Sequence, residues 1–272
     1  MVWRLLPVLL LLGGIGSTSG EAPQLPIFDA HIHYSQSAWQ SVTPEQALAI
    51  LDQAGVQWAL VSSTPDDGTL KLHKAAPQRM IPVLRPYRNR ADMGSWHSDP
   101  EVQAYVESRL KHGVYKGIGE FHLSASNVAA PVVRRFAALA EAHALFLHAH
   151  VDDAAIEQMC HLYPKVRLLW AHAGMSASAK TVGRLVAQCN NLWVELALRF
   201  DVAPDGQLDP AWQALFLKHP DRFLIGTDTW LPERWSELVE EIETKRRWLA
   251  QLPREVAQQL AYQNGQRLLE AR

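Results

Sequence analysis

The sequence predicts a single α/β domain folded as a (β/α)8 TIM barrel with additional C-terminal helices. Eight short apolar segments alternate with helical patterns almost to the end of the chain. No internal repeat, low-complexity segment or linker divides them. Once an N-terminal leader is set aside, about 250 residues remain, a usual size for one such barrel. Because alternating buried strands and helices form parallel sheets, and a count of eight indicates closure, these observations point to one barrel.

Each predicted strand is a short apolar run. In chain order the strands are expected at residues 27–33, 58–63, 80–87, 115–122, 145–150, 167–173, 192–197 and 223–228. Three helix starts between them share a capping side chain followed by proline: Thr43 before Pro44, Asp99 before Pro100, and Asp209 before Pro210. Residues 66–79 are expected to form a loop with a short helix. Residues 233–249 and 253–269 are expected to form two amphipathic helices that cover the outside of the barrel.

Residues 1–22 are predicted to be a cleavable secretory signal peptide, which leaves residues 23–272 as the barrel domain. Arg4 precedes an apolar run at residues 5–12, and small residues follow. The run is too short to span a membrane, so we expect an exported, periplasmic or secreted protein with no stable membrane insertion after cleavage. A retained N-terminal anchor is the alternative. In an oxidising compartment Cys160 and Cys189 could pair, but we expect two unpaired, packed thiols.

The composition narrows the class of partner. Hydrophobic residues make up 48% of the chain, which is ample material for a buried core, and the formal net charge is only −2. A nearly neutral chain offers no broad electrostatic surface for nucleic acid or acidic membranes. We therefore expect a small-molecule substrate, and the sequence leaves homo-oligomerisation open.

Residues 27–35, IFDAHIHYS, place two histidines in an otherwise buried strand. Side chains alternate along a strand, so His31 and His33 project on the same side. Taken alone, the pair fits satisfied core histidines as well as a metal site. Other predicted strands, however, also carry polar residues at their carboxyl ends: Glu120, His148, His150, His172 and Asp228. Because these ends share one rim of a closed barrel, where barrel active sites lie, we expect a metal centre there.

The ligand types indicate which ion the centre would hold. Nitrogen and oxygen ligands without sulfur favour one or two zinc ions, with manganese, iron or nickel as alternatives. Divalent ions lower the pKa of bound water and polarise a substrate oxygen.

The order of these residues resembles the amidohydrolase superfamily, in its amidohydrolase-related (amidohydrolase 2) branch. The similar motifs are FDAHIH, KGIGEFH, WAHAG and GTDT, and the resemblance runs from about residue 27 to the C-terminal NGQRLL. It implies a metal-dependent hydrolase whose ligands are divided between two ions: His31, His33 and Asp228 on the first, His148 and His172 on the second, with Glu120 bridging. Asp228 would also take the proton of the attacking water and pass it to the leaving group, which makes it the catalytic base. Many relatives bridge with a carboxylated lysine, whereas TatD-type nucleases use glutamate.

Four further residues are predicted to bind substrate: His150, Arg85, Trp230 and Arg199. The segment RPYRNR also places Arg88 and Arg90 on the rim, where guanidinium groups suit a carboxylate or phosphate. A solvated loop with surface ion pairs is an equal alternative. The role of His122 is left undecided, and Asp29 fits hydrogen bonding as well as ligation.

The predicted function is hydrolysis of a C–N or C–O bond, in an amide, lactone or ester, of a small substrate that is neutral or anionic. One alternative is a metal-dependent phosphoesterase or TatD-like nuclease, which Glu120 and the arginine loop favour. A second is a mononuclear decarboxylase of the same superfamily, which Glu120 disfavours. A third is a non-catalytic exported barrel that binds a metal or ligand. The fold alone would not choose among them.

Overall fold

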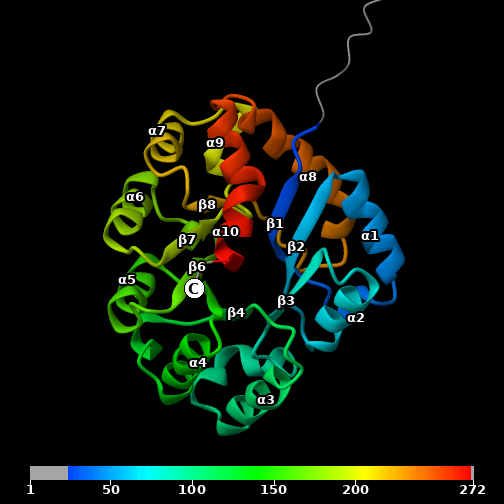
Figure 1. Cartoon of the computed structure of the whole chain (residues 1–272), viewed down its shortest axis with the longest axis vertical. Coiled ribbons are helices and arrows are strands. Elements are labelled where there is room, and N and C mark those ends of the chain that lie inside the picture. Colours follow the sequence, from blue (N-terminus) through cyan, green and yellow to red (C-terminus); the bar gives the residue numbers. More distant parts are fainter. Residues whose placement is uncertain (1–23, 271–272) are drawn as a thin grey trace, which may run out of the picture.

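Eight parallel strands stand side by side in chain order and curve into a near-closed barrel (Figure 1). The computed structural model describes residues 24–270. The strands are β1 (Ile27–Ile32), β2 (Val56–Val61), β3 (Met80–Leu84), β4 (Gly117–His122), β5 (Phe146–His150), β6 (Arg167–Trp170), β7 (Leu192–Glu195) and β8 (Phe223–Leu224). Every consecutive pair is parallel. The predicted (β/α)8 barrel is confirmed, and each observed strand overlaps its predicted segment.

Hydrogen bonds close the seam between β8 and β1. The Ala30 amide donates to the Ile225 carbonyl at 2.8 Å. Asp29 is fully buried and accepts from the Thr227 hydroxyl at 2.6 Å and from the Thr227 amide at 3.1 Å. Of the two roles that fit Asp29 in the sequence, the structure shows hydrogen bonding. This carboxyl fastens the chain after β8 to β1 and so fixes the part of the rim that both strands share.

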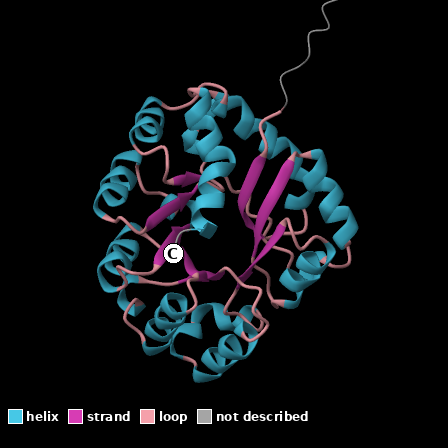
Figure 2. Cartoon of the chain, in the orientation of Figure 1, coloured by secondary structure: helices cyan, strands magenta, loops and turns pink. Residues whose placement is uncertain are grey.

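Helices surround the barrel and alternate with its strands (Figure 2). They are α1 (Pro44–Gln53), α2 (Asp67–Ala75), α3 (Pro100–Leu110), α4 (Pro131–Ala142), α5 (Asp153–Leu162), α6 (Ala179–Gln188), α7 (Pro210–Lys218), α8 (Arg234–Leu249), α9 (Arg254–Gln258) and α10 (Asn264–Glu270). The predicted caps are confirmed, because Thr43, Asp99 and Asp209 each accept a backbone N–H of the helix they precede. The short helix expected within residues 66–79 is α2.

Short helical turns occupy several loops. The 3-10 turns are η1 (Gln36–Ala38), η2 (Arg90–Gly94), η3 (Trp96–Ser98), η4 (Ala125–Asn127), η5 (Ala171–Gly174), η6 (Phe200–Val202) and η7 (Pro204–Gly206). A π-helical turn, η8 (Gln259–Gln263), separates α9 from α10. Among residues 24–270, no helix is both long and apolar enough to cross a membrane. The predicted signal peptide lies outside the described residues and stays a prediction.

The C-terminal helices do not all cover the outside of the barrel, which corrects one prediction. Helix α8 packs against α1 on the outside, but α10 contacts β1 and β8. Leu268 of α10 joins Phe28, Phe146 and Leu224 in an apolar cluster inside the barrel. Gly265 permits this approach, because any side chain there would collide with the Phe28 ring. The tail helix therefore closes one end of the barrel (Figure 1), and the carboxyl ends of the strands remain for the site.

Cys160 and Cys189 form a disulfide, so the expectation of two unpaired thiols is wrong. Their Cα atoms are 5.9 Å apart, a usual separation for a disulfide. Cys160 lies on α5, and Cys189 directly follows α6. Consecutive helices of a barrel pack side by side, so residues far apart in the chain can meet there. The sequence alone does not show how the two helices are rotated toward each other.

Candidate metal centre

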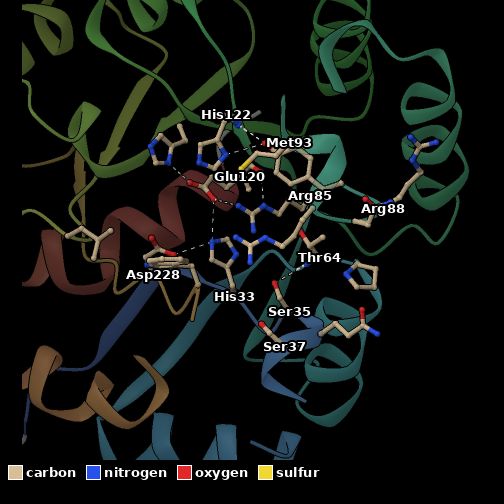
Figure 3. A pocket seen from close by; sticks show the side chains of 18 of the residues that line it. His33, Ser35, Ser37, Thr64, Arg85, Arg88, Met93, Glu120, His122 and Asp228 are labelled. Atoms are coloured by element: carbon tan, nitrogen blue, oxygen red, sulfur yellow. Dashed lines mark hydrogen bonds and ion pairs between the residues drawn. The ribbon is translucent and has the colours of Figure 1, made fainter. Parts of the chain in front are cut away.

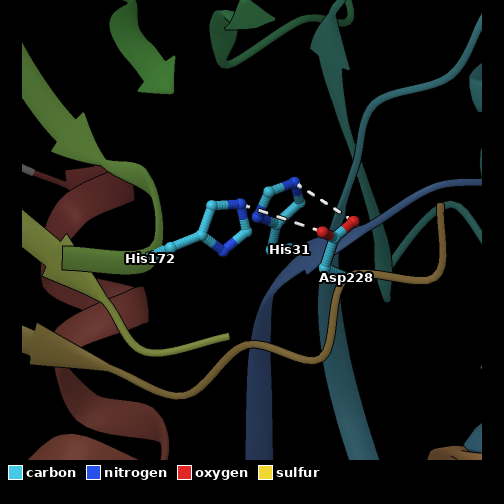
Figure 4. A group of neighbouring side chains, drawn as sticks. All are labelled: His31, His172 and Asp228. Carbon is cyan, nitrogen blue, oxygen red and sulfur yellow. Dashed lines mark ion pairs between the residues drawn. The ribbon is translucent and has the colours of Figure 1, made fainter. Parts of the chain in front are cut away.

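Seven polar side chains, which lie on six strands or in the segments that directly follow them, meet at the carboxyl ends of the barrel strands. They are His31, His33, Glu120, His148, His172, Glu195 and Asp228, and each is at most 5% exposed. Six of the seven are the ligands predicted from the sequence, and the structure brings all six together. Figure 4 shows His31, His172 and Asp228, from three separate parts of the chain, pointing toward one another.

The two histidines of β1 face the two predicted carboxylate ligands. His31 Nε2 and His33 Nε2 are 3.0 Å apart. Glu120 Oε2 lies 3.5 Å from the first of these nitrogens and 3.3 Å from the second. Asp228 Oδ1 lies 3.8 Å and 3.2 Å from them. Two imidazole nitrogens that face each other as well as two carboxylates form a donor set suited to a divalent cation.

The remaining predicted ligands present unpaired atoms to the same space. His172 Nε2 is 3.6 Å from Glu120 Oε1 and 3.8 Å from Asp228 Oδ2. Nε2 of His148, Nε2 of His172 and Oδ1 of Asp228 are buried, yet none has a hydrogen-bond partner among the described residues. A buried polar atom without a partner costs about 1–3 kcal/mol. Three such atoms in one cluster are explained if they bind an ion, so the residues present fit a metal.

Glu195 is a member of this cluster that the sequence analysis missed. It accepts from His31 Nδ1 at 2.9 Å and from the backbone amides of His172 and Ala197 at 2.6 Å each. Burial alone would raise its pKa, but His172 and His31 outweigh burial and lower the pKa of Glu195 to about 2. The signal was present in the sequence, because Glu195 interrupts the apolar run LWVELA as Glu120 interrupts its own strand.

The Nδ1 atoms of three histidines are held by groups behind the cluster. His31 Nδ1 contacts Glu195, His33 Nδ1 contacts the Ser62 carbonyl, and His172 Nδ1 is 3.1 Å from the Ala197 carbonyl. A carbonyl or carboxylate partner assigns the proton to Nδ1. In the neutral form of the ring, which is the form that binds a metal, the lone pair then lies on Nε2, which faces the cluster. Such outer partners orient metal-binding histidines.

Glu120 is held in place by two cationic or donating side chains. Arg85 Nη2 donates to Oε2 at 2.7 Å (Figure 3). His150 Nδ1 lies 2.7 Å from Oε1. Burial would raise the pKa of Glu120, but the charges of His31 and Arg85 hold it well below its usual value. Each carboxylate oxygen keeps a second lone pair. Oε2 lies 3.5 Å from His31 Nε2 and 3.3 Å from His33 Nε2, and Oε1 lies 3.6 Å from His172 Nε2. This arrangement is compatible with the predicted bridge, which stays a prediction.

Asp228 adopts an unusual backbone conformation, which contacts from Arg234 stabilise. Its φ is 58° and that of His172 is 55°, a left-handed region that non-glycine residues rarely occupy outside functional sites. Arg234 donates to the Asp228 carbonyl at 2.6 Å and to the Thr227 carbonyl at 2.7 Å. Burial would raise the pKa of Asp228, but His31 and His33 lower it, so this carboxyl is ionised and can accept a proton.

The four predicted substrate-binding residues have different surroundings. Arg85 and His150 line a cavity of about 870 Å³ above the cluster, and Trp230 lines it with 48% of its surface exposed. Arg199 is a correction. Its guanidinium donates to the carbonyls of Ala173 and Ala177 and to Asp201, and it stacks over Trp212. It is buried and does not line that cavity, so the structure gives it a structural role.

His122, which the sequence left undecided, packs face to face with His150. Their ring centroids are 4.1 Å apart, and His122 Nδ1 lies 3.2 Å from the Tyr87 hydroxyl. Burial lowers the pKa of His122 to about 4, so this ring is neutral at physiological pH. A neutral ring beside His150 acts as a packing surface on the floor of the cavity.

A comparison with family models identifies the chain. The model described as amidohydrolase, of the amidohydrolase 2 family, matches residues 93–271. The chain belongs to the amidohydrolase family. The resemblance drawn from the sequence motifs is thus confirmed, and this amidohydrolase is a metal-dependent hydrolase whose buried histidines and carboxylates suit a divalent ion. A comparison with curated proteins gives no match.

Several solved structures share the fold of this amidohydrolase. An amidohydrolase from Burkholderia multivorans with bound zinc is 12% identical, with a TM-score of 0.61 over 90% of this chain and 99% of that one. A proposed 2-pyrone-4,6-dicarboxylic acid hydrolase from Pseudomonas putida is 14% identical, with a TM-score of 0.63 over 91% and 98%. A TatD homologue from Escherichia coli K12 is 14% identical, with a TM-score of 0.61 over 90% and 98%. These likenesses show the barrel fold.

Proposed function

We propose that this amidohydrolase hydrolyses a C–N or C–O bond, in an amide, lactone or ester, of a small anionic substrate. The observation that carries the proposal is the cluster of buried, unpaired donor atoms of His148, His172 and Asp228 beneath an open cavity. A bound divalent ion would lower the pKa of a water molecule that it holds and would polarise the substrate carbonyl. The rest of the chemistry belongs to the side chains.

The side chains divide the work as follows. His31, His33 and Asp228 would hold a first ion, His148 and His172 would hold a second, and Glu120 would contribute to both. Asp228 is ionised and takes the proton of the attacking water, then returns it to the leaving group. Glu195 and Arg234 keep His31 and Asp228 in position. The nitrogen and oxygen donor set supports zinc, and zinc is bound in the related B. multivorans structure.

A metal-dependent phosphoesterase is the second candidate. Glu120 favours it, because the TatD-type nucleases that the sequence resembles carry glutamate at this position, and a TatD homologue shares the fold. The near-neutral net charge of −2 does not favour a long DNA substrate. Similar structures named for hydrolysis of a dicarboxylic acid support a small anionic substrate instead.

The surroundings of the protein are also proposals. The disulfide between Cys160 and Cys189 supports export to an oxidising compartment, periplasmic or extracellular, as the predicted signal peptide requires. A small-molecule substrate agrees with a buried centre under one cavity.

Metal analysis of the purified protein, with Glu120→Gln beside it, tests the proposal. Two ions per chain in the parent and fewer in the variant support the bridged centre, whereas one ion in both supports a mononuclear plan. The exposed Glu240 supplies a matched control, and Glu240→Gln should keep the parent's metal content. A panel of lactones, esters, amides and phosphodiesters then separates hydrolase from phosphoesterase. Turnover that survives complete removal of metal would contradict both.

A further inference from the structure

The cleft above the metal centre has two lobes. Lobe 1 is the cavity of about 870 Å³ that His33, Glu120 and Asp228 line. Lobe 2 is a neighbouring cavity of about 560 Å³ over the loops that follow β4, β5 and β6. The two cavities share four lining residues, Met93, His122, His150 and Met175. A ligand that reaches the metal centre can therefore extend into both lobes, with the stacked His122 and His150 rings beneath their junction.

Three arginines line lobe 1, and the structure distinguishes them sharply. Arg85 is paired with Glu120. Arg88 forms ion pairs at 2.7–3.0 Å with the carboxylates of Asp92, Asp99 and Glu101. It lies apart from Glu120 in Figure 3. Arg90 is exposed, and within the described part of the chain it has neither an ion pair nor a side-chain hydrogen bond. Arg90 is thus the cation of lobe 1 whose donors remain available to a ligand.

Lobe 2 has a different chemical character. Its described lining contains no lysine or arginine, and its neutral polar groups are Ser124, Asn127 and Ser176. The Asn127 amide nitrogen contacts Ser124 Oγ and His97 Nε2, whereas the Asn127 amide oxygen and the Ser176 hydroxyl have no hydrogen-bond partner among the described residues. Its one carboxylate, Asp152, caps α5 by accepting the Ala155 amide at 2.8 Å. An anion entering lobe 2 would meet no permanent cation in the described lining, whose only basic side chains are His97, His122 and His150. An uncharged group with hydroxyl or amide functions would find partners.

We propose that the substrate carries a carboxylate on one side of the scissile bond and an uncharged, hydrogen-bonding group on the other. The carboxylate binds Arg90 in lobe 1, and the uncharged group occupies lobe 2. This inference rests on the proposed hydrolase function and specifies its substrate class. A carboxylate fits better than a phosphate monoester, because the single free guanidinium balances one negative charge, and a second would remain unpaired in the cavity that Glu120 and Asp228 also line.

Binding of simple acids to the zinc-loaded protein tests the role of Arg90. Succinate, glutarate and adipate are each compared by calorimetry with the monoacid of equal length, butyrate, valerate and hexanoate. The monoacid measures binding at the metal centre alone. For the best-fitting member, the second carboxylate should tighten binding about tenfold at low salt, and less at high salt. Arg90→Gln should erase this gain. Arg254→Gln, at an exposed arginine on α9 that lines neither lobe, should keep it.

The outcomes distinguish failure of the proposed substrate class from failure of the proposed hydrolase function. If the gain persists in Arg90→Gln, or if no diacid exceeds its monoacid in the parent, the role of Arg90 is refuted. If 3-phosphonopropionate binds more tightly than succinate, the choice of carboxylate over phosphate is refuted. A protein that takes up none of zinc, manganese, iron and nickel refutes the proposed function itself, and this inference falls with it.

Lobe 2 is tested by filling it from Gly94. A Cβ at Gly94 would meet no atom within 4 Å, so a larger side chain is accepted without a clash at its base. The probes are two glutarate monoamides, one of methylamine and one of serinol. Gly94→Phe should weaken binding of the serinol amide about tenfold and leave the methylamide unchanged, whereas Gly94→Ala should leave both unchanged. Equal binding of the serinol amide by all three proteins would overturn the assignment of lobe 2.

Discussion

Replacing Glu195 by glutamine is expected to weaken both metal binding and the fold. Glu195 holds His31 Nδ1 at 2.9 Å and accepts the His172 and Ala197 amides at 2.6 Å each. Glutamine has nearly the same shape, but its amide nitrogen is a donor. In either orientation it therefore turns an N–H group toward a backbone N–H that the carboxylate now satisfies. The orientation of His31 loses its anchor at the same time.

The structure sets the size of both effects. Loss of a partner behind a metal ligand typically lowers metal affinity by about 10–100-fold. Burial would raise the pKa of Glu195, but His172 and His31 lower it from 4.5 to about 2. In the metal-free protein this contributes about 3 kcal/mol to the free energy of unfolding. Because folding lowers this pKa, the stabilisation is fully present above pH 4.5 and is lost as the pH falls toward 2.

Two assays measure these effects separately. Zinc affinity is measured by competition with a chelator, and the free energy of unfolding by urea titration of metal-free protein. Glu195→Gln should bind zinc more weakly than the parent and unfold more easily near neutral pH, with a smaller difference at about pH 3.5. Glu240→Gln, at an exposed position on α8, should match the parent. Zinc affinity and stability of Glu195→Gln equal to those of the parent would refute the reasoning.

Three further perturbations address neighbouring parts of the fold. Arg234→Met removes the donors that hold the backbone of Asp228, so kcat should fall about tenfold with little change in KM; an unchanged kcat would contradict a positioning role. Burial raises the pKa of Asp29 from 3.8 to about 7, so the stabilisation by the protonated carboxyl is fully present below pH 3.8 and is lost as the pH rises through 7. In urea titrations that compare pH 4 with pH 8, Asp29→Asn should remove this loss of stability, which is worth about 4 kcal/mol. Parallel pH profiles of variant and parent would count against this explanation. Replacing Cys160 and Cys189 together by serine removes a disulfide that joins residues separated by 29 positions in the sequence. The free energy of unfolding should fall by about 3 kcal/mol. Stability equal to that of the parent would show that the disulfide adds nothing.

The candidate ligands were predictable because strand geometry is local. A strand alternates its side chains, so His31 and His33 had to share one side, and a polar residue that ends an apolar run had to lie at the rim. The same rule would have identified Glu195, had the run LWVELA been examined for its buried carboxylate. Burial of an unpaired carboxylate is costly enough that its place in a strand is itself a signal.

The sequence by itself determined the barrel, the order of its strands and the set of polar residues on one rim, since periodicity and chain order dictate these. Only the tertiary structure decided which partner each polar group found. Four arginines that look alike in the sequence differ in this respect. Arg85 pairs with Glu120, and Arg88 pairs with three carboxylates. Arg90 pairs with no carboxylate in the described chain, and Arg199 binds backbone carbonyls and Asp201. The disulfide and the closing of the barrel by α10 were decided in the same way. The physical reason is that alternation fixes the side on which a residue faces, whereas a hydrogen bond or ion pair depends on distances of a few ångströms between segments far apart in the chain.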